Sequence, residues 1–130
     1  MDGSPKLDDR VEIVFAHRDE IAEVFYSKLF VVLPEVQTYL FPDFEKQKKM
    51  FAMMVTMLAR SIEDTNGLEE YAAQLAAVHS RFDITPEQFL VGGAVLKTSI
   101  SEVLGSAITL RDRIDLNRAA DRIITAMKSK

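Results

Sequence analysis

The sequence contains no cysteine and no tryptophan, and only two histidines occur among its 130 residues. The absence of cysteine excludes disulfides, thiolate metal sites, iron–sulfur clusters, covalently attached heme and a cysteine nucleophile. Any metal chemistry must therefore use the two histidines, carboxylates or a cofactor that the chain binds.

Long apolar runs and an excess of positive charge are also missing. No uncharged run is longer than ten residues, so no segment is expected to span a membrane. The net charge of −4 and the pI near 5.2 argue against a nucleic-acid partner, which usually requires a basic face. The N-terminal sequence MDGSPKLDD lacks the charged-then-apolar pattern of a signal peptide, so a cytoplasmic location is expected.

The sequence has enough apolar residues for one folded unit. Hydrophobic residues make up 48% of the chain and charged residues 28%, which excludes a disordered chain. The length suits a single domain spanning residues 1–130. Five glycines and four prolines divide the chain into long segments whose apolar residues follow helical rather than alternating spacing. The predicted class is all-α.

Start and stop signals delimit these helices. The clearest is Thr85-Pro86-Glu87-Gln88, a capping box with proline at the first helical position, and its helix is expected to end at Gly105. The other predicted helices run from Ser4 to His17, Arg18 to Leu33, Pro34 to Tyr39, Phe44 to Asp64, Leu68 to Arg81 and Thr109 to Met127. Gly92-Gly93 inside a helix favours close, steeply crossed helices, but the patterning alone does not choose between a four-helix bundle and crossed packing.

One of the histidines lies on the apolar face of the segment Leu68–Arg81. His79 follows Leu75 at i+4 spacing, and Phe82 continues the same face. A core histidine with satisfied nitrogens is the commoner explanation. Against it, Ser80 is the only close polar neighbour in sequence, and an unpaired buried nitrogen costs about 1–3 kcal/mol. The alternative is an axial bond to an iron already held by a porphyrin, because one histidine cannot hold a bare metal ion.

Several motifs follow one another at consistent spacing between Val24 and Gly105. They are Phe25-Tyr26-Ser27-Lys28-Leu29-Phe30, Pro34-Glu35-Val36, Phe41, Gln47, Met50-Phe51-Ala52-Met53, Ala76-Ala77-Val78-His79, Phe89-Leu90-Val91-Gly92 and Ser101-Glu102-Val103-Leu104-Gly105. In their order and distances these motifs resemble the globin family, most closely the single-domain bacterial hemoglobins and the globin domain of flavohemoglobins. The resemblance implies a globin-like fold of crossed helices with short first and last helices, and heme b (iron protoporphyrin IX) as cofactor.

The resemblance also implies individual roles. His79 matches the proximal histidine that ligates heme iron, and Tyr26 and Gln47 match residues that hydrogen-bond the gas ligand on the opposite side. The implied apolar contacts to heme are Phe41, Phe51, Leu75, Ile84 and Phe89. From the residues alone, the alternative is that Tyr26 bonds a backbone carbonyl and Gln47 is exposed.

The implied function is reversible binding of O2, and of NO and CO, as a carrier or gas sensor. Flavohemoglobin-type globins are expected to brace the proximal histidine with a tyrosine and a glutamate. The tyrosine position holds Phe89 here, and the glutamate position falls near Lys128-Ser129-Lys130, so self-contained NO dioxygenation is not expected. An NO dioxygenase served by an external reductase and a heme-free interaction module are the alternatives. The sequence leaves the oligomeric state open.

Three further polar features are expected to face solvent. His17 lies at the junction of the first two helices among charged neighbours. Lys46, Lys48 and Lys49 form the main basic cluster, for which neutralising the heme propionates is a second possible role. The last helix carries alternating arginines and aspartates between Arg111 and Arg122, which is typical of a solvated face.

Overall fold

The fold was obtained as a computed structural model that describes residues 7–39, 44–62, 70, 72–73, 76 and 84–128. The elements in chain order are α1 (Leu7–Ala16), α2 (Arg18–Val32), the 3₁₀ helix η1 (Pro34–Tyr39), α3 (Phe44–Arg60), α5 (Pro86–Leu104), the 3₁₀ helix η3 (Gly105–Ala107) and α6 (Leu110–Lys128). No strand occurs in this part of the chain, which confirms the all-α class. None of its helices has a stretch long and apolar enough to cross a membrane.

Both ends of α5 lie where the sequence predicts them. The backbone N–H of Gln88 donates to Thr85 Oγ1 at 3.1 Å, and the backbone N–H of Thr85 donates to Gln88 Oε1 at 2.9 Å. This reciprocal pair satisfies donors that the first turn of a helix cannot pair internally. At the other end, Gly105 has a φ of +45°, a left-handed conformation that glycine adopts without steric cost. The helix ends there.

The two terminal helices differ in length. At ten residues α1 is short, as expected, but α6 has 19 residues, so the prediction of a short last helix is wrong. The reason is a buried stripe that recurs along the whole of α6 with helical spacing. Its members are Leu116, Ala119, Ala120, Ile123 and Met127. Of the predicted helix Leu68–Arg81, the described residues Glu70, Ala72, Ala73 and Ala76 are helical.

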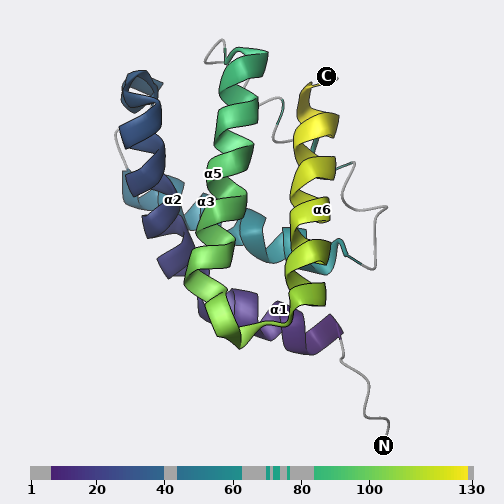
Figure 1. Cartoon of the computed structure of the whole chain (residues 1–130). Helices are drawn as coiled ribbons and strands as arrows, with labels where there is room; N and C mark the ends of the chain where they lie inside the picture. Colours follow the sequence, from purple (N-terminus) through teal and green to yellow (C-terminus); the bar gives the residue numbers. More distant parts are fainter. Residues whose placement is uncertain are drawn as a thin grey trace, which may run out of the picture.

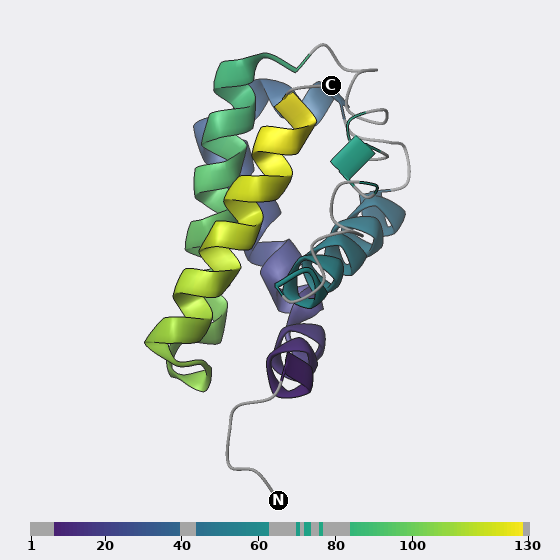
Figure 2. The same ribbon diagram turned by 90° about the vertical axis from the view of Figure 1, so that its right-hand side faces the viewer.

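The helices pack in a crossed arrangement. In Figure 1, α2, α5 and α6 stand side by side, α1 lies across their base, and α3 runs behind α5 and α6 at a steep angle to both. The quarter-turned view in Figure 2 shows α5 and α6 as a closely packed pair, with α3 to the right of the pair. The core between them is closed by fully buried side chains from five helices. They include Val14, Ile21, Val55, Leu58, Ile100, Leu104, Leu116 and Ile123.

The two adjacent glycines of α5 have different surroundings. A β-carbon at position 93 would overlap with Cδ1 of Ile124, whereas a β-carbon at position 92 would meet no atom of the described residues within 4 Å. Gly93 therefore lets the Ile124 side chain of α6 pack directly against the α5 backbone. The close approach expected of Gly92-Gly93 depends on Gly93.

Candidate functional site

Tyr26 lies in the middle of α2, and only 8% of its surface is exposed. Its ring centroid is 5.2 Å from that of Phe44 and 5.4 Å from that of Phe51, both on α3 and both in edge-to-face geometry. On α2 itself, Phe25 lies edge-on at 5.1 Å and Phe30 lies tilted at 5.8 Å. Edge-to-face contacts are the favoured geometry of aromatic pairs. The Tyr26 ring is therefore held on several sides.

Phe51 completes this group by stacking on Phe25, with centroids 4.2 Å apart and an interplanar angle of 20°. Phe44 and Phe51 are seven residues apart, which is about two helical turns, so both face α2. We call these five rings, Phe25, Tyr26, Phe30, Phe44 and Phe51, the aromatic cluster. It joins the middle of α2 to the first two turns of α3.

Gln47 adds an amide to the aromatic cluster. Its side chain is half-buried on α3, between Phe44 and Phe51, and Nε2 donates to the hydroxyl oxygen of Tyr26 over 3.4 Å. This distance is at the long end for an N–H···O hydrogen bond. No group in the described ranges accepts the hydroxyl proton of Tyr26. The structure thus brings Tyr26, Gln47 and Phe51 together.

The environment of Tyr26 also fixes its protonation state. Burial raises the pKa of the Tyr26 phenol above its ordinary value of 10.0, and the hydrogen bond from Gln47 lowers it by a smaller amount. Burial acts in this direction because it disfavours the charged phenolate. At neutral pH the hydroxyl is consequently a protonated donor.

Two of the other residues expected to contact a cofactor, Ile84 and Phe89, lie at the start of α5. Ile84 lies two residues before α5 and Phe89 lies in its first turn; both are half-buried, and Phe89 packs against the core. Phe89 has no hydroxyl, so it cannot make the hydrogen bond that a tyrosine would offer at that position. Phe41, Leu75 and His79 lie outside the described residues.

His17, the other histidine, is half-buried rather than exposed, so the expectation of a solvated side chain is wrong. Its Nδ1 lies 2.8 Å from the backbone carbonyl of Ile13, at the junction of α1 and α2. The same carbonyl also accepts the backbone N–H of His17 at 3.2 Å, so the imidazole folds back over the last turn of α1. The described residues contain no group of three or more His, Asp or Glu side chains that could hold a metal ion.

Lys48 is more enclosed than the sequence predicts. Its side chain is 15% exposed, and Nζ donates to Glu23 of α2 and, over 2.8 Å, to Glu45 of α3. Nζ also lies 5.0 Å from the centroid of the Phe44 ring. The hydrogen bond to Glu23, followed by that to Glu45, raises the pKa of Lys48. The expectation of a solvated lysine fails because α3 packs with this turn against α2.

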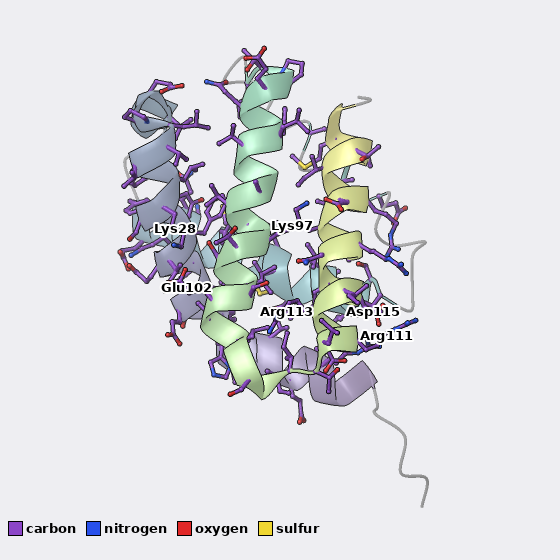
Figure 3. The ribbon with its side chains drawn as sticks, in the orientation of Figure 1. Lys28, Lys97, Glu102, Arg111, Arg113 and Asp115 are labelled. Carbon is purple, nitrogen blue, oxygen red and sulfur yellow. The ribbon has the colours of Figure 1, made fainter. Side chains whose placement is uncertain are left out.

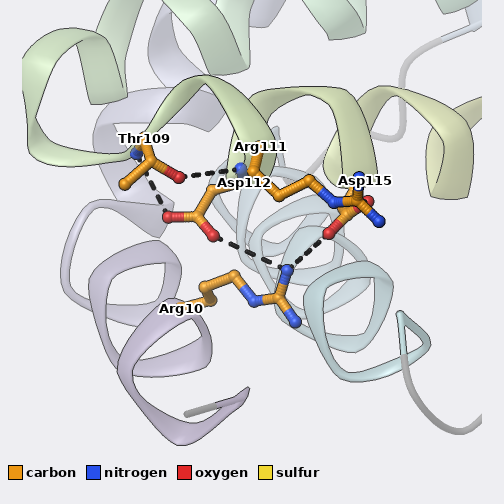
Figure 4. A network of polar contacts seen from close by, with 5 residues as sticks. All are labelled: Arg10, Thr109, Arg111, Asp112 and Asp115. Atoms are coloured by element: carbon orange, nitrogen blue, oxygen red, sulfur yellow. Dashed lines mark hydrogen bonds and ion pairs between the residues drawn. The ribbon is translucent and has the colours of Figure 1, made fainter. Parts of the chain in front are cut away.

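The charged face of α6 is also partly turned inward. Arg10 of α1 donates from Nη1 to Asp115 at 2.7 Å and lies 3.6 Å from a carboxylate oxygen of Asp112, as Figure 4 shows. The three side chains are 12–17% exposed, so the prediction of a fully solvated face is wrong here. Arg111 approaches the other oxygen of Asp115 at 3.4 Å. The crossing of α1 over the start of α6 encloses these charges.

Asp112 has a second role that the sequence reasoning missed. The backbone N–H of Thr109 donates to Asp112 at 3.1 Å, and the backbone N–H of Asp112 donates to Thr109 Oγ1 at 3.0 Å. This is the geometry of a capping box with aspartate at the third position. The signal Thr109-x-x-Asp112 was present in the sequence. The box links the start of α6 to the Arg10 contact.

Comparison with known protein families places the sequence among related chains. A family model described as Globin matches residues 23–127. A flavohemoprotein of Rhizobium meliloti (strain 1021) is 29% identical over 100 residues, which is 75% of this chain and 25% of that protein. A flavohemoprotein of Oceanobacillus iheyensis is 30% identical over 102 residues, 76% of this chain and 25% of that protein. The chain thus spans about a quarter of the length of these curated relatives.

Solved structures with the same fold confirm the expected architecture. A bacterial globin from Campylobacter jejuni superposes with a TM-score of 0.76 at 22% identity, covering 95% of this chain and 92% of that chain. The engineered carbene transferase RmaNOD from Rhodothermus marinus, named as a nitric oxide dioxygenase, gives 0.73 at 23% identity over 93% and 89%. The globin domain of E. coli DosC, in ferrous form, gives 0.66 at 19% identity over 94% and 85%.

Proposed function

The chain belongs to the globin family, whose model covers residues 23–127, and on this premise we propose that it binds heme b through His79 and reversibly holds a diatomic gas beside Tyr26 and Gln47. The gas is O2, with NO and CO as further ligands, and the role is that of a carrier or gas sensor. The observation that carries the proposal is the buried Tyr26 hydroxyl, whose proton has no acceptor in the described ranges.

The residues present fit a heme group. Heme supplies an iron atom with one coordination position for the protein and one for a small ligand. Of the two histidines, His79 is the proposed axial ligand, because its position matches the proximal histidine that the family resemblance implies. The proposed apolar contacts to the ring are Phe41, Phe51, Leu75, Ile84 and Phe89. Those of them that the structure describes are half-buried.

Tyr26 and Gln47 would act as a pair of polar groups on an otherwise apolar side. The Tyr26 phenol is protonated at neutral pH, because burial raises its pKa. A protonated donor held by neighbouring rings stabilises a polar gas ligand by about 1 kcal/mol, and by more when charge assists. The Gln47 amide donates to the same phenol oxygen, and a donor on that oxygen strengthens the O–H as a donor in turn.

The first experiment asks whether the chain takes up heme. Purified protein titrated with hemin should give a Soret band, and His79→Ala should abolish or reshape that band. A protein that stays colourless with excess hemin would support the alternative of a heme-free interaction module and overturn the proposal.

The second experiment tests the polar pair. Tyr26→Phe should speed O2 dissociation about five- to tenfold, since one hydrogen bond to the ligand is lost. CO dissociation should change much less, because CO is a poorer hydrogen-bond acceptor, so CO serves as the internal control. An unchanged O2 rate would remove Tyr26 from the gas site.

NO dioxygenation with an external reductase is the second candidate, favoured by the similarity to flavohemoproteins. Phe89 argues against an efficient version, since it offers no hydroxyl at the position where the bracing tyrosine is expected. Sustained consumption of NO over many turnovers, with a reductase and its electron donor supplied, would support this activity. Consumption that ends after one equivalent would leave simple gas binding.

A further inference from the structure

We propose that Lys48 is a positioning residue for gas binding: by tying the first turns of α3 to Glu23 of α2, it sets how closely the Gln47 amide approaches the Tyr26 hydroxyl. The proposal deepens the proposed function and rests on it. Its consequence is that gas release depends on ionic strength through one ion pair between two helices.

The ion pair lies close to the hydrogen bond in both helices. On α3, Lys48 directly follows Gln47, and on α2, Glu23 comes three residues before Tyr26, which places the two on neighbouring positions of one helical face. Lys48 donates to Glu23 across the helix contact, while Gln47 donates to Tyr26 across the same contact. Because the ion pair and the hydrogen bond join the same turns of the two helices, loss of the ion pair should also displace the Gln47 amide from the Tyr26 hydroxyl.

The charges of this bridge are unequally exposed. The Lys48 side chain is 15% exposed, whereas Glu23 and Glu45 are 61% and 75% exposed. The ammonium is therefore enclosed between Phe44 and the two carboxylates, and the carboxylates reach solvent. Ion pairs with solvent-exposed partners are screened by salt. High salt should act in the same direction as loss of the lysine.

The hydrogen bond that Lys48 would control is sensitive to small shifts. Its N···O distance of 3.4 Å is already long, so a further displacement of a few tenths of an ångström removes most of its strength. The aromatic contacts of Tyr26 hold its ring, but apolar contacts are non-directional and tolerate sliding of one helix along the other. The pair from Lys48 to Glu23 adds a directional link directly beside Gln47.

The first test uses the heme-free chain. The pKa of the Tyr26 phenol is measured by NMR of ¹³C-labelled tyrosine, with Tyr26→Phe to assign the signal. The Gln47 hydrogen bond holds this pKa down against burial, so Lys48→Met and Glu23→Gln should raise it, in the same direction as Gln47→Leu. Lys48→Arg, which keeps the charge, should restore the wild-type value. Lys28→Met is the matched control, since it removes the Lys28–Glu102 ion pair between α2 and α5 shown in Figure 3.

The second test uses the hemin-loaded chain, with O2 and CO as probes. Lys48→Met should speed O2 dissociation about two- to fivefold, the range that an exposed ion pair can contribute, and should leave CO dissociation unchanged. Raising the salt to about 0.5 M should speed O2 release from the wild type and from Lys28→Met, but not from Lys48→Met. If Lys48→Met does not fold, the O2 dissociation rate of Glu23→Gln and the effect of salt on the wild-type rate test the same role of the ion pair.

The outcomes separate the two proposals. If Tyr26→Phe speeds O2 release but Lys48→Met and Glu23→Gln change neither the Tyr26 pKa nor that rate, the role of Lys48 is wrong and the proposed function stands. If Tyr26→Phe itself has no effect on O2 release, the gas site is wrong. Equal acceleration by Lys48→Met and Lys28→Met would indicate general loosening of α2 and would also overturn the role of Lys48.

Discussion

The contact of α1 with α6 and the contact of α2 with α3 both enclose polar side chains, but the first is centred on an ion-paired arginine and the second on a neutral phenol. At the first, Arg10 lies between Asp112 and Asp115, and Asp112 also accepts the Thr109 backbone N–H. At the second, the Tyr26 hydroxyl accepts one long hydrogen bond, and its own proton finds no acceptor in the described ranges. A paired cluster contributes to the stability of the fold, whereas an open donor is available to a ligand. The predictions that follow test this division.

The largest effect is expected at the α1–α6 contact. Arg10→Met removes the cation that the enclosed carboxylates of Asp112 and Asp115 share, and should lower the free energy of unfolding by about 2 kcal/mol. Urea unfolding of the full chain measures this loss. Lys28→Met, which breaks a more exposed ion pair, should cost less than about 0.5 kcal/mol. Equal losses of unfolding free energy in the two variants would show that the enclosed ion pairs of Arg10 stabilise the fold no more than an exposed ion pair does. O2 release from Arg10→Met should match the wild type.

A smaller effect is expected at the start of α6. Thr109→Ala removes the cap acceptor and should cost about 1 kcal/mol. Thr85→Ala at the start of α5 should cost a similar amount, because its box has the same two hydrogen bonds. The two differ in coupling: Asp112 is shared with Arg10, so Thr109→Ala and Arg10→Met should be non-additive, while Thr85→Ala and Arg10→Met should add. Additivity in both pairs would contradict a single connected network.

The smallest effect on stability is expected at Tyr26. Near neutral pH, Tyr26→Phe should change the free energy of unfolding by less than about 0.5 kcal/mol, since only one long hydrogen bond is lost. At alkaline pH the variant should differ from the wild type. The pKa of Tyr26 is raised in the folded state, so its contribution is fully present below the ordinary value of 10.0 and is lost as pH rises through the folded pKa.

Unfolding curves at a series of alkaline pH values measure this difference. As pH rises, the free energy of unfolding should fall more steeply for the wild type than for Tyr26→Phe. Lys48 is present in both proteins, so the pH dependence that its raised pKa causes cancels in the difference. Parallel curves would mean that the phenol is not buried in solution. A large loss of stability at neutral pH would mean that Tyr26 belongs with the paired cluster.

Local signals predicted much of the fold from the sequence. The capping box at Thr85 and the glycine at position 105 each act within a few residues, and both ends of α5 are confirmed. The start and end of α6 were predicted within about one residue from the sequence, and only the resemblance led to the wrong expectation of a short last helix. Termini depend on neighbours in sequence, so a single sequence suffices to find them.

The candidate site was less accessible to sequence reasoning. Only the family resemblance suggested that Tyr26 and Gln47 lie together, since their helices are separated along the chain. Nothing in the pattern distinguished Lys48 from the solvated charges beside it, whereas Asp112 carried a capping signal that was overlooked. Which polar residue is enclosed depends on how two helices cross, and the crossing is set by side chains from both partners. The half-buried position of His17 was not predicted either, because its partner is a backbone carbonyl, which every residue type carries.

The bare backbone at position 93 has a consequence for anyone who redesigns this scaffold. The methyl end of Ile124 fills the space where a side chain of α5 would begin, so any residue other than glycine at position 93 requires this methyl group to move. Libraries that vary α5 should leave Gly93 unchanged. They can vary position 92, where a β-carbon would meet no atom of the described part of the chain within 4 Å. Two identical residues side by side thus differ in how much change the protein tolerates at each.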